Sequence, residues 1–312
     1  MKKLKNMRMK TALAFLFTVI LGSQVLYAQE WAPDEVEAMA DRAEKTVLKA
    51  YELLWMVNQR IDMADTVRDP RHTGVIGEEF SPLTTTMGYR EAKDLSTMPG
   101  WAGWLVRNLT FHGIWKGADV AVAFSGSFPG LNIAVLAALQ ELGADVVGIS
   151  SVGASSWGAN VVGLSWPEME RLLREEGILK KTSGAVSIGG TGDRGAELSD
   201  YGLDLAMKAV KNSRLPFIDS INLRDSIKKR KLFYGSIGRY FCYINVGGNQ
   251  ASMGGGAHIR FDHGGWYFEP SETRGDPDGV MDAFLAMGVP CLNLLYLEGL
   301  NSRERIVNLE QH

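Results

Sequence analysis

Ser125 and Ser127 are the first residues in the chain whose types and spacing could do chemistry. They lie in Ser-Gly-Ser-Phe-Pro-Gly at 125–130, between a short apolar segment at 121–124 and an alanine-rich segment that ends at Gly143. We expect a buried strand that leads through this tight loop into a helix N-terminus, where unpaired backbone N–H groups favour a carboxylate, a phosphate or a developing oxyanion. An ordinary turn between a strand and a helix explains the loop equally well, so the rest of the chain must decide.

Three more loops of small polar residues follow predicted strands, namely SSVGASSWGAN at 150–160, GGTGDRG at 189–195 and GGNQASMGGG at 247–256. The carboxyl ends of parallel strands meet at one edge of a sheet, and open α/β proteins bind their ligands there. Glycines in such loops let the backbone approach a ligand closely. The four loops together therefore predict one ligand site at this edge. The residues predicted to contact the ligand are Gly126, Asn132, Ser155, Ser156, Asn160, Gly190, Gly192, Asn249 and Ser252.

The candidate catalytic residues are Ser127, Ser125 and Asp193. Serine hydrolases hold their nucleophile at a strand-to-helix turn, but this turn lacks the G-x-S-x-G form. A Ser–His–Asp triad would need His258 or His263, which follow the fourth loop. Asp193 could act as a general acid or base, or it could simply cap a turn.

Neither a metal nor a cofactor is predicted. The sequence H-x-x-x-D-H at 258–263 contains metal-ligand residue types. In an extended strand, however, His258 and Asp262 would share one face and His263 would point away. GGTGDRG lacks both the lysine-hydroxyl ending of a phosphate-binding loop and the full dinucleotide fingerprint.

The elements that must position these residues alternate in type after residue 115. Apolar strands are predicted at 118–125, 145–150, 184–190, 215–218, 240–246 and 289–295, and helices at 130–143, 166–176, 199–213, 223–232 and 279–287. This alternation predicts an α/β domain over 115–312 with a mainly parallel, doubly wound sheet. Residues 29–114 are predicted to form a helical N-terminal appendage, with an amphipathic helix at 33–61, an irregular polar segment at 64–100 and a second helix at 101–113.

Residues 1–28 read as a signal peptide or a signal anchor. Five basic residues precede an apolar run from 11 to 22, which is the order of parts in a secretory signal. Leu26 makes the cleavage site imperfect, and the 18 residues from 11 to 28 are the least that can span a bilayer, so cleavage and anchoring both stay open. A cleaved signal peptide and an uncleaved anchor would both place the bulk of the protein outside the cytoplasm, in a periplasmic or other extracytoplasmic space.

Charge and cysteine content narrow the possible partners. Loss of the five basic residues in 1–28 takes the formal net charge from −3 to −8, and nucleic-acid binding needs a basic surface, so no nucleic-acid partner is expected. Cys242 and Cys291 lie in predicted buried strands and are expected to be small core residues. Export would also permit them to pair, and the sequence leaves this open.

Five stretches of the exported part, in order, resemble the poly-gamma-glutamate system proteins of bacteria. They are GVIGEEFSPLTTTMG (74–88), SGSFPGLNIAVLAA (125–138), GISSVGASSWGAN (148–160), SIGGTGDRGAELSDYG (187–202) and INVGGNQASMG (244–254). The resemblance implies association with a membrane-located system that makes or exports poly-gamma-glutamate, an anionic cell-surface polymer. It implies poly-gamma-glutamate or a glutamyl ligand and the membrane subunits of that system as partners. It carries over no catalytic residue.

The sequence therefore leads to two functional expectations. The first is an exported or membrane-anchored accessory protein of poly-gamma-glutamate biosynthesis or export, which binds the polymer or glutamyl groups at the strand-end loops. The alternative is a serine-type hydrolase or transferase that acts on gamma-glutamyl amide bonds, with backbone N–H groups as an oxyanion hole.

Overall fold

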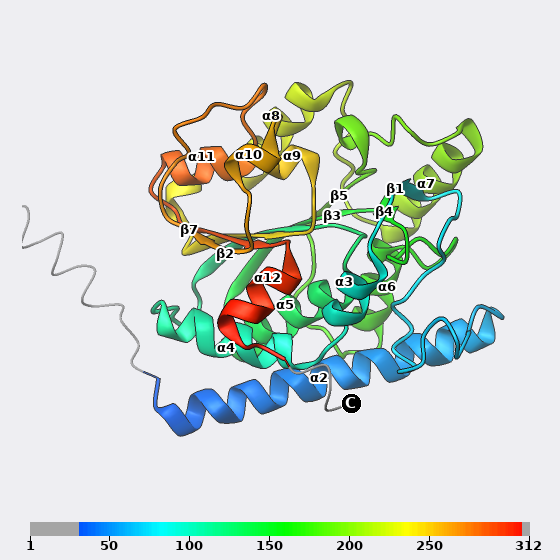
Figure 1. The fold of residues 1–312 in the computed structure, drawn as a ribbon, viewed down its shortest axis with the longest axis horizontal. Helices are drawn as coiled ribbons and strands as arrows, with labels where there is room; N and C mark the ends of the chain where they lie inside the picture. Colours follow the sequence, from blue (N-terminus) through cyan, green and yellow to red (C-terminus); the bar gives the residue numbers. More distant parts are fainter. Residues whose placement is uncertain (1–30, 308–312) are drawn as a thin grey trace, which may run out of the picture.

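A computed structural model describes residues 31–307 of the chain, and the signal segment predicted at 1–28 lies outside the described residues. The fold is α/β, with one mixed sheet between two layers of helices (Figure 1). Among residues 31–307, no helix is both long enough and apolar enough to cross a membrane.

The sheet has six strands, of which the first five in spatial order are parallel and the last is antiparallel. In that order they are β5 (Ala185–Ser187), β3 (Asp145–Ser151), β2 (Asp119–Phe124), β6 (Cys242–Val246), β8 (Cys291–Leu294) and β7 (Gly265–Tyr267). The central strands are short apolar runs buried on both faces, as parallel strands covered by helices must be. The predicted α/β fold with a mainly parallel, doubly wound sheet is confirmed.

The strand order changes direction beside β2. From β2 the chain builds outward through β3 to β5, then returns to the other side of β2 to add β6 and β8. The loops that leave β2 and β6 therefore run to helices on opposite faces, and a crevice opens between them at the carboxyl ends of the strands.

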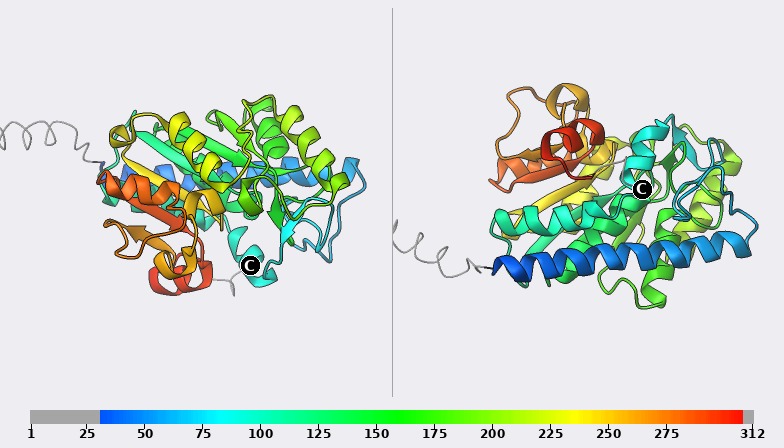
Figure 2. Two further views of the ribbon diagram at one scale, coloured as in Figure 1. Left: turned by 90° about the horizontal axis from the view of Figure 1, so that it is seen from above. Right: turned by 60° about the horizontal axis from the view of Figure 1, so that its bottom comes forward.

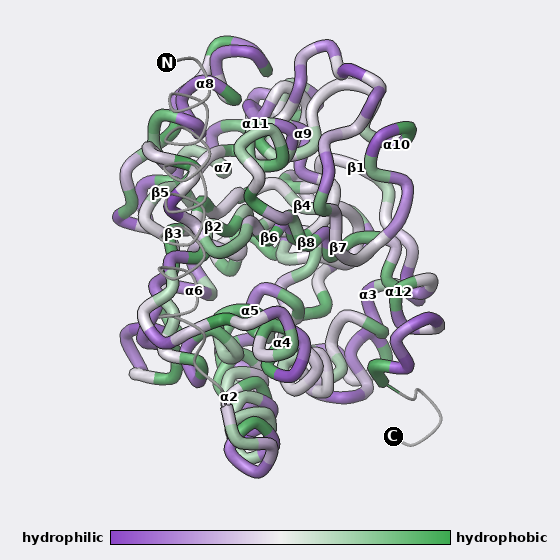
Figure 3. The backbone as a smooth tube through the Cα atoms, turned by 90° about the vertical axis from the view of Figure 1, so that its left-hand side faces the viewer, coloured by the Kyte–Doolittle hydropathy of each residue, from purple (hydrophilic) through white to green (hydrophobic). Residues whose placement is uncertain are grey.

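Alternate residues of β2 divide the core between the two helical layers. Val120, Val122 and Phe124 pack toward α2 (Pro33–Arg60), α4 (Gly100–Phe111), α5 (Pro129–Glu141) and α6 (Trp166–Glu175). Ala121 and Ala123 pack toward α8 (Leu223–Tyr234), α9 (Gln250–Met253) and α11 (Val280–Ala286), whose larger aromatic side chains need the room that alanine leaves. Figure 3 shows these two layers on either side of the strands.

The long helix α2 packs against α4 and α5, along the lower edge of the molecule as it is drawn in Figure 1. Its buried residues, among them Met39, Val47 and Leu54, recur at the spacing of one helical face and pack on α4 and α5. The opposite face of α2 is hydrophilic where it meets solvent (Figure 3). The predicted helices at 33–61 and 101–113 are confirmed, and α2 and α4 share one core with the sheet (Figure 2).

The remaining predicted elements along the chain agree in type, with one exception. The helix predicted from 199 to 213 is α7 (Asp200–Ser213), and the Ser199 side chain accepts the predicted capping bond from Gly202 N at 3.1 Å. The strand predicted at 215–218 is absent from the described sheet, because Phe217 forms only a single bridge with Val186. This short apolar segment lies beside β5, where Val186 N donates to the Pro216 carbonyl and Ile218 N donates to the Val186 carbonyl, but the pairing extends no further.

The segment from 64 to 100 is more ordered than its sequence indicates. It contains β1 (Thr84–Thr86), which pairs with β4 (Ala154–Ser155), and a short helix, α3 (Arg90–Ser96). Near the C-terminus, α10 (Ala257–Arg260) and β7 lie in a stretch for which no element was predicted, and α12 (Leu297–Glu304) follows β8. Cys242 and Cys291 are both buried and unpaired, which confirms their expected place in the core.

Candidate functional site

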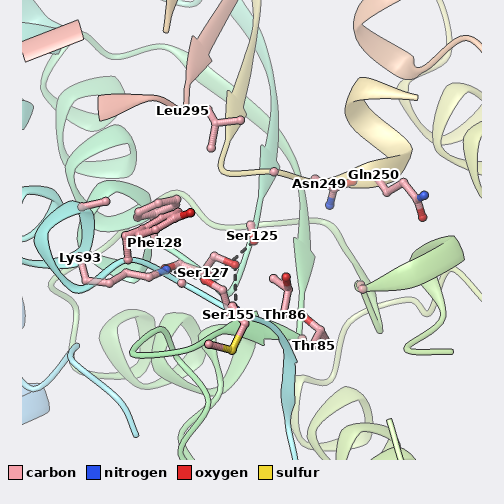
Figure 4. Close-up of a pocket in the computed structure, with 18 of the residues that line it drawn as sticks. Thr85, Thr86, Lys93, Ser125, Ser127, Phe128, Ser155, Asn249, Gln250 and Leu295 are labelled. Atoms are coloured by element: carbon pink, nitrogen blue, oxygen red, sulfur yellow. Dashed lines mark hydrogen bonds between the residues drawn. The ribbon is translucent and has the colours of Figure 1, made fainter. Parts of the chain in front are cut away.

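A cleft of about 1090 Å³ lies where the parallel strands end. The loops that follow β2, β3, β5, β6 and β8 all contribute to its wall, together with residues from β1 to α3. In Figure 4, Lys93 reaches toward Ser127 and Ser155 on one side of the cleft, while Asn249 and Gln250 lie on the other. The four loops singled out in the sequence thus surround one space.

The residues predicted as site residues divide into two groups. Those that line the cleft are Ser125, Ser127, Ser155, Gly190, Asp193 and Asn249. Those that do not line it are Gly126, Asn132, Ser156, Asn160, Gly192 and Ser252, most of which are buried in the supporting structure. The second group positions the wall of the cleft.

The loop after β2 is held in place from beneath. Asn132, in the first turn of α5, donates from Nδ2 to the Ser125 carbonyl at 2.8 Å, and Ser127 N donates to Ser125 Oγ at 3.1 Å. A Cβ at Gly126 would lie 2.9 Å from two backbone carbonyl oxygens, those of Val152 and Gly153. Only glycine lets the loops after β2 and β3 pack together this closely.

Asn160 fastens the segment that carries β1. Its Nδ2 donates to the Glu78 carbonyl at 2.8 Å and to Thr84 Oγ1 at 2.9 Å, while its Oδ1 accepts from Glu78 N at 2.8 Å. With both ends of the amide engaged and the side chain fully buried, Asn160 anchors β1 and leaves no group for a ligand.

Asp193 is the counter-ion of a buried arginine. Arg230, on α8, is fully buried and donates to both Asp193 oxygens, from Nε at 2.7 Å and from Nη2 at 2.8 Å. Ser187 and Ser226 also donate to the same carboxylate. These partners occupy both oxygens, so the side chain ties the loop after β5 to α8, although the residue borders the cleft.

The wall formed by the loop after β6 rests on a second polar network. Asn249 caps α9 by accepting from Ser252 N at 3.0 Å, and its Nδ2 donates to Ser151 Oγ at 3.2 Å. Ser252 Oγ lies 2.8 Å from the Tyr243 hydroxyl, beneath the cleft surface. Gln250 bridges the cleft wall by accepting from Gly192 N at 2.6 Å.

Lys93 is a cleft residue that sequence reasoning missed. It lies on α3, is only 2% exposed, and donates from Nζ to the Ser127 carbonyl and to Ser155 Oγ, the latter at 2.7 Å. Nζ also lies 4.0 Å from the centre of the Phe128 ring. Burial lowers the pKa of the Lys93 ammonium from its usual 10.5 to about 7, so the amine is partly uncharged at neutral pH.

The cleft is otherwise acidic at its border. Lys93 is the single cationic residue among the residues that line it, and no ion pair to Lys93 is found within residues 31–307. Carboxylates lie around it at Glu91, Glu197 and Glu298. Burial of a lysine without a counter-ion destabilises the fold. Such residues in clefts are therefore candidates for a functional role.

The two histidines considered for a triad lie away from this wall. His258 is exposed on α10, so the extended geometry considered for 258–263 does not apply to it, and His263 Nδ1 lies 2.8 Å from Asp262 Oδ1. Neither histidine lines the cleft. Within residues 31–307 no group of three or more potential metal ligands is brought together.

Comparison with protein-family models, with curated proteins and with solved structures finds no match to this chain. No signal in the sequence identifies Lys93, because the surrounding residues Arg-Glu-Ala-Lys-Asp-Leu-Ser have the composition of an ordinary surface helix.

Proposed function

We propose that the protein is an exported or membrane-anchored accessory protein of poly-gamma-glutamate production, and that its cleft binds the glutamyl groups of the polymer. The observation that carries the proposal is the convergence of five strand-end loops on one large open cleft at the point where the strand order changes direction. The resemblance of the loop sequences to the poly-gamma-glutamate system proteins supplies the class of ligand.

The donors around the cleft suit a gamma-glutamyl unit. Each unit of the polymer offers one amide in its main chain and one α-carboxylate beside it. Hydroxyl and amide groups of Thr86, Ser127, Thr191, Asn249 and Gln250 border the cleft and can meet both. Its volume of about 1090 Å³ lies just above the range of roughly 300–1,000 Å³ typical of small-molecule sites, so it has room for more than one unit.

The carboxylates at the border of the cleft favour contact with only a short part of the polymer. Glu91, Glu197 and Glu298 would repel a long polyanion at low ionic strength. We therefore expect recognition of a chain end or of a few units within the cleft, and weak dependence of binding on salt. The membrane subunits of the same system are the proposed protein partners, reached through residues 1–28 or through export into their compartment.

Binding of defined polymers to the full exported chain tests this proposal. Calorimetric titration should show binding of short poly-gamma-glutamate and not of poly-alpha-glutamate of equal length, which has the same charge but a different linkage. The double substitution Ser127→Ala and Thr86→Val should weaken binding about tenfold or more, because two neutral hydrogen bonds contribute about 0.5–1.5 kcal/mol each. Ser236→Ala, at an exposed serine far from the cleft wall, serves as the matched control.

Equal binding of both polymers, or of neither, would show that the cleft does not recognise gamma-glutamyl groups. In the cell, deletion of the gene should change the polymer. A loss of total polymer would indicate a part in assembly, whereas a change in chain length at constant yield would indicate processing.

A further inference from the structure

We infer that Ser155 and Lys93 form a serine–lysine pair that cleaves or transfers gamma-glutamyl amide bonds, with Ser155 Oγ as the nucleophile and the Lys93 amine as the base. The inference rests on the proposed function for its substrate class. It differs from the serine mechanism expected from the sequence, in which Ser127 or Ser125 would attack.

The contact between the two side chains is the first support. Lys93 Nζ and Ser155 Oγ are 2.7 Å apart, within the range at which a base can take a hydroxyl proton. Ser155 lines the cleft, and it is fixed in position by the pairing of β4 with β1. Lys93 is held by α3 with its ammonium pointing into the same wall (Figure 4).

The surroundings of Lys93 keep its amine available as a base. Burial is the cause of its lowered pKa, and the groups around Nζ are the Ser155 hydroxyl, the Ser127 carbonyl and the Phe128 ring. The charged residues that face the cleft are Glu91 on α3, Asp193 and Glu197 after β5, and Glu298 on α12. Asp193 is engaged by Arg230 and, within the described part of the chain, none of the four forms an ion pair with Lys93. On α3 itself, Arg90 and Asp94 pair with each other.

The reaction balances without any metal or cofactor. The uncharged Lys93 amine takes the proton of the Ser155 hydroxyl as Oγ attacks the carbonyl carbon of the gamma-amide. The C–N bond then breaks, the departing nitrogen takes the proton from the Lys93 ammonium, and a glutamyl ester of Ser155 remains. Water or an acceptor amine attacks this ester, again giving its proton to Lys93, and the proton returns to Ser155 Oγ as the ester bond breaks. Water yields a free gamma-carboxylate, and an amine yields a new gamma-amide.

Ser127 has a positioning role in this scheme. Its Oγ accepts from Ser155 N at 3.0 Å, and its carbonyl accepts from Lys93 Nζ, so one residue holds both members of the pair. Removal of the Ser127 hydroxyl should slow the reaction without abolishing it, and the pH at half-maximal rate should stay unchanged.

A fluorophosphonate probe tests the pair directly, because Ser155 Oγ would form a bond to phosphorus as fluoride leaves. Mass spectrometry of the labelled full exported chain should place the adduct on Ser155. Labelling should vanish in Ser155→Ala and fall about 100-fold or more in Lys93→Met, the usual scale of a lost general base. In the unsubstituted protein the labelling rate should rise with pH around a midpoint near 7, and Lys93→Met should lack this rise. Ser236→Ala and Lys208→Met, both at exposed positions, are the matched controls.

Adduct formation and polymer binding, measured separately, distinguish the serine–lysine pair from the proposed function. Circular dichroism and polymer binding show whether Ser155→Ala is folded, and the chain length of incubated poly-gamma-glutamate shows cleavage. Polymer binding with no adduct on Ser155 would overturn the serine–lysine pair and leave the proposed function standing. An adduct on Ser127 in place of Ser155 would also overturn the assignment. An adduct on Ser155 in a protein that binds no poly-gamma-glutamate would support the pair and remove the proposed function.

Discussion

At the scale of single residues, Lys93 places an amine in the protein interior, and no carboxylate within residues 31–307 forms an ion pair with it. The unfolded chain holds a proton on this lysine up to its usual pKa of 10.5, whereas the folded chain releases it near 7. Since the unfolded state then binds more protons between these values, the destabilising effect of Lys93 is complete below pH 7 and declines as the pH rises toward 10.5.

Lys93→Met should therefore stabilise the fold most at acid pH. Methionine removes the buried charge and fills similar space, at the cost of the hydrogen bonds to Ser127 and Ser155. Urea unfolding should show a gain over the unsubstituted protein that is larger at pH 6 than at pH 9, by about 1.4 kcal/mol for each pKa unit of the difference that is titrated. A gain that is the same at both pH values would mean that Lys93 titrates normally in the folded protein. The exposed lysine change Lys208→Met should give no pH-dependent difference.

At the scale of elements, the wall of the cleft depends on how closely the loops after β2 and β3 pack. Gly126→Ala would introduce a methyl group 2.9 Å from the carbonyl oxygens of Val152 and Gly153, and these belong to the backbone, which moves only with its strand. We expect a loss of about 1–3 kcal/mol in the free energy of unfolding, as for other overpacked sites. Thermal unfolding followed by circular dichroism measures it. Gly238→Ala, where the nearest atom is a flexible methionine end at 3.9 Å, should change stability little, and an equal loss at both sites would contradict the packing argument.

The secondary-structure elements differ in how well they could be predicted from the sequence. The strands β2, β3 and β6 are apolar runs followed by loops of small polar residues, so their pattern indicates both their type and their common edge. α3, β1 and β4 span only two to seven residues, too few to show a periodic pattern, and they are held by tertiary contacts such as those of Asn160. Lys93 lies on α3 and was missed for that reason.

The sequence predicts the location of the candidate site better than it predicts which side chains line the cleft. Small polar loops indicate where the backbone can approach a ligand, which placed Ser127, Ser155 and Asn249 on the cleft. They do not indicate which polar atoms are used within the protein. Asn132, Asn160 and Asp193 have their polar groups turned to other loops and helices, a pairing that only the folded chain determines.

At the scale of the whole molecule, α2 and the sheet should unfold together, because α2 shares its core with α4, α5 and the sheet. Leu54→Ala, at a fully buried position of α2, should lower the free energy of unfolding by about 2–5 kcal/mol. Denaturant curves followed by tryptophan fluorescence and by far-ultraviolet circular dichroism should shift together and coincide. An early separate transition for α2 would show an independent appendage. Leu48→Ala, on the exposed face of α2, should cost less than about 0.5 kcal/mol.

The orientation of α2 also sets the distance between its N-terminal end and the cleft. Its first residues lie near the start of the sheet, where Trp31 Nε1 donates to the Ile114 carbonyl, while Tyr51 lies beside the start of α5 at Gly130, under the cleft. From Pro33 to Tyr51 the helix rises about 27 Å at 1.5 Å per residue. The N-terminal end of α2 therefore lies about 27 Å along the helix axis from the part of α2 that lies under the cleft. Because α2 packs on both α4 and α5, it behaves as one rigid element, and any force applied at its N-terminal end would be transmitted along the helix to the residues under the cleft.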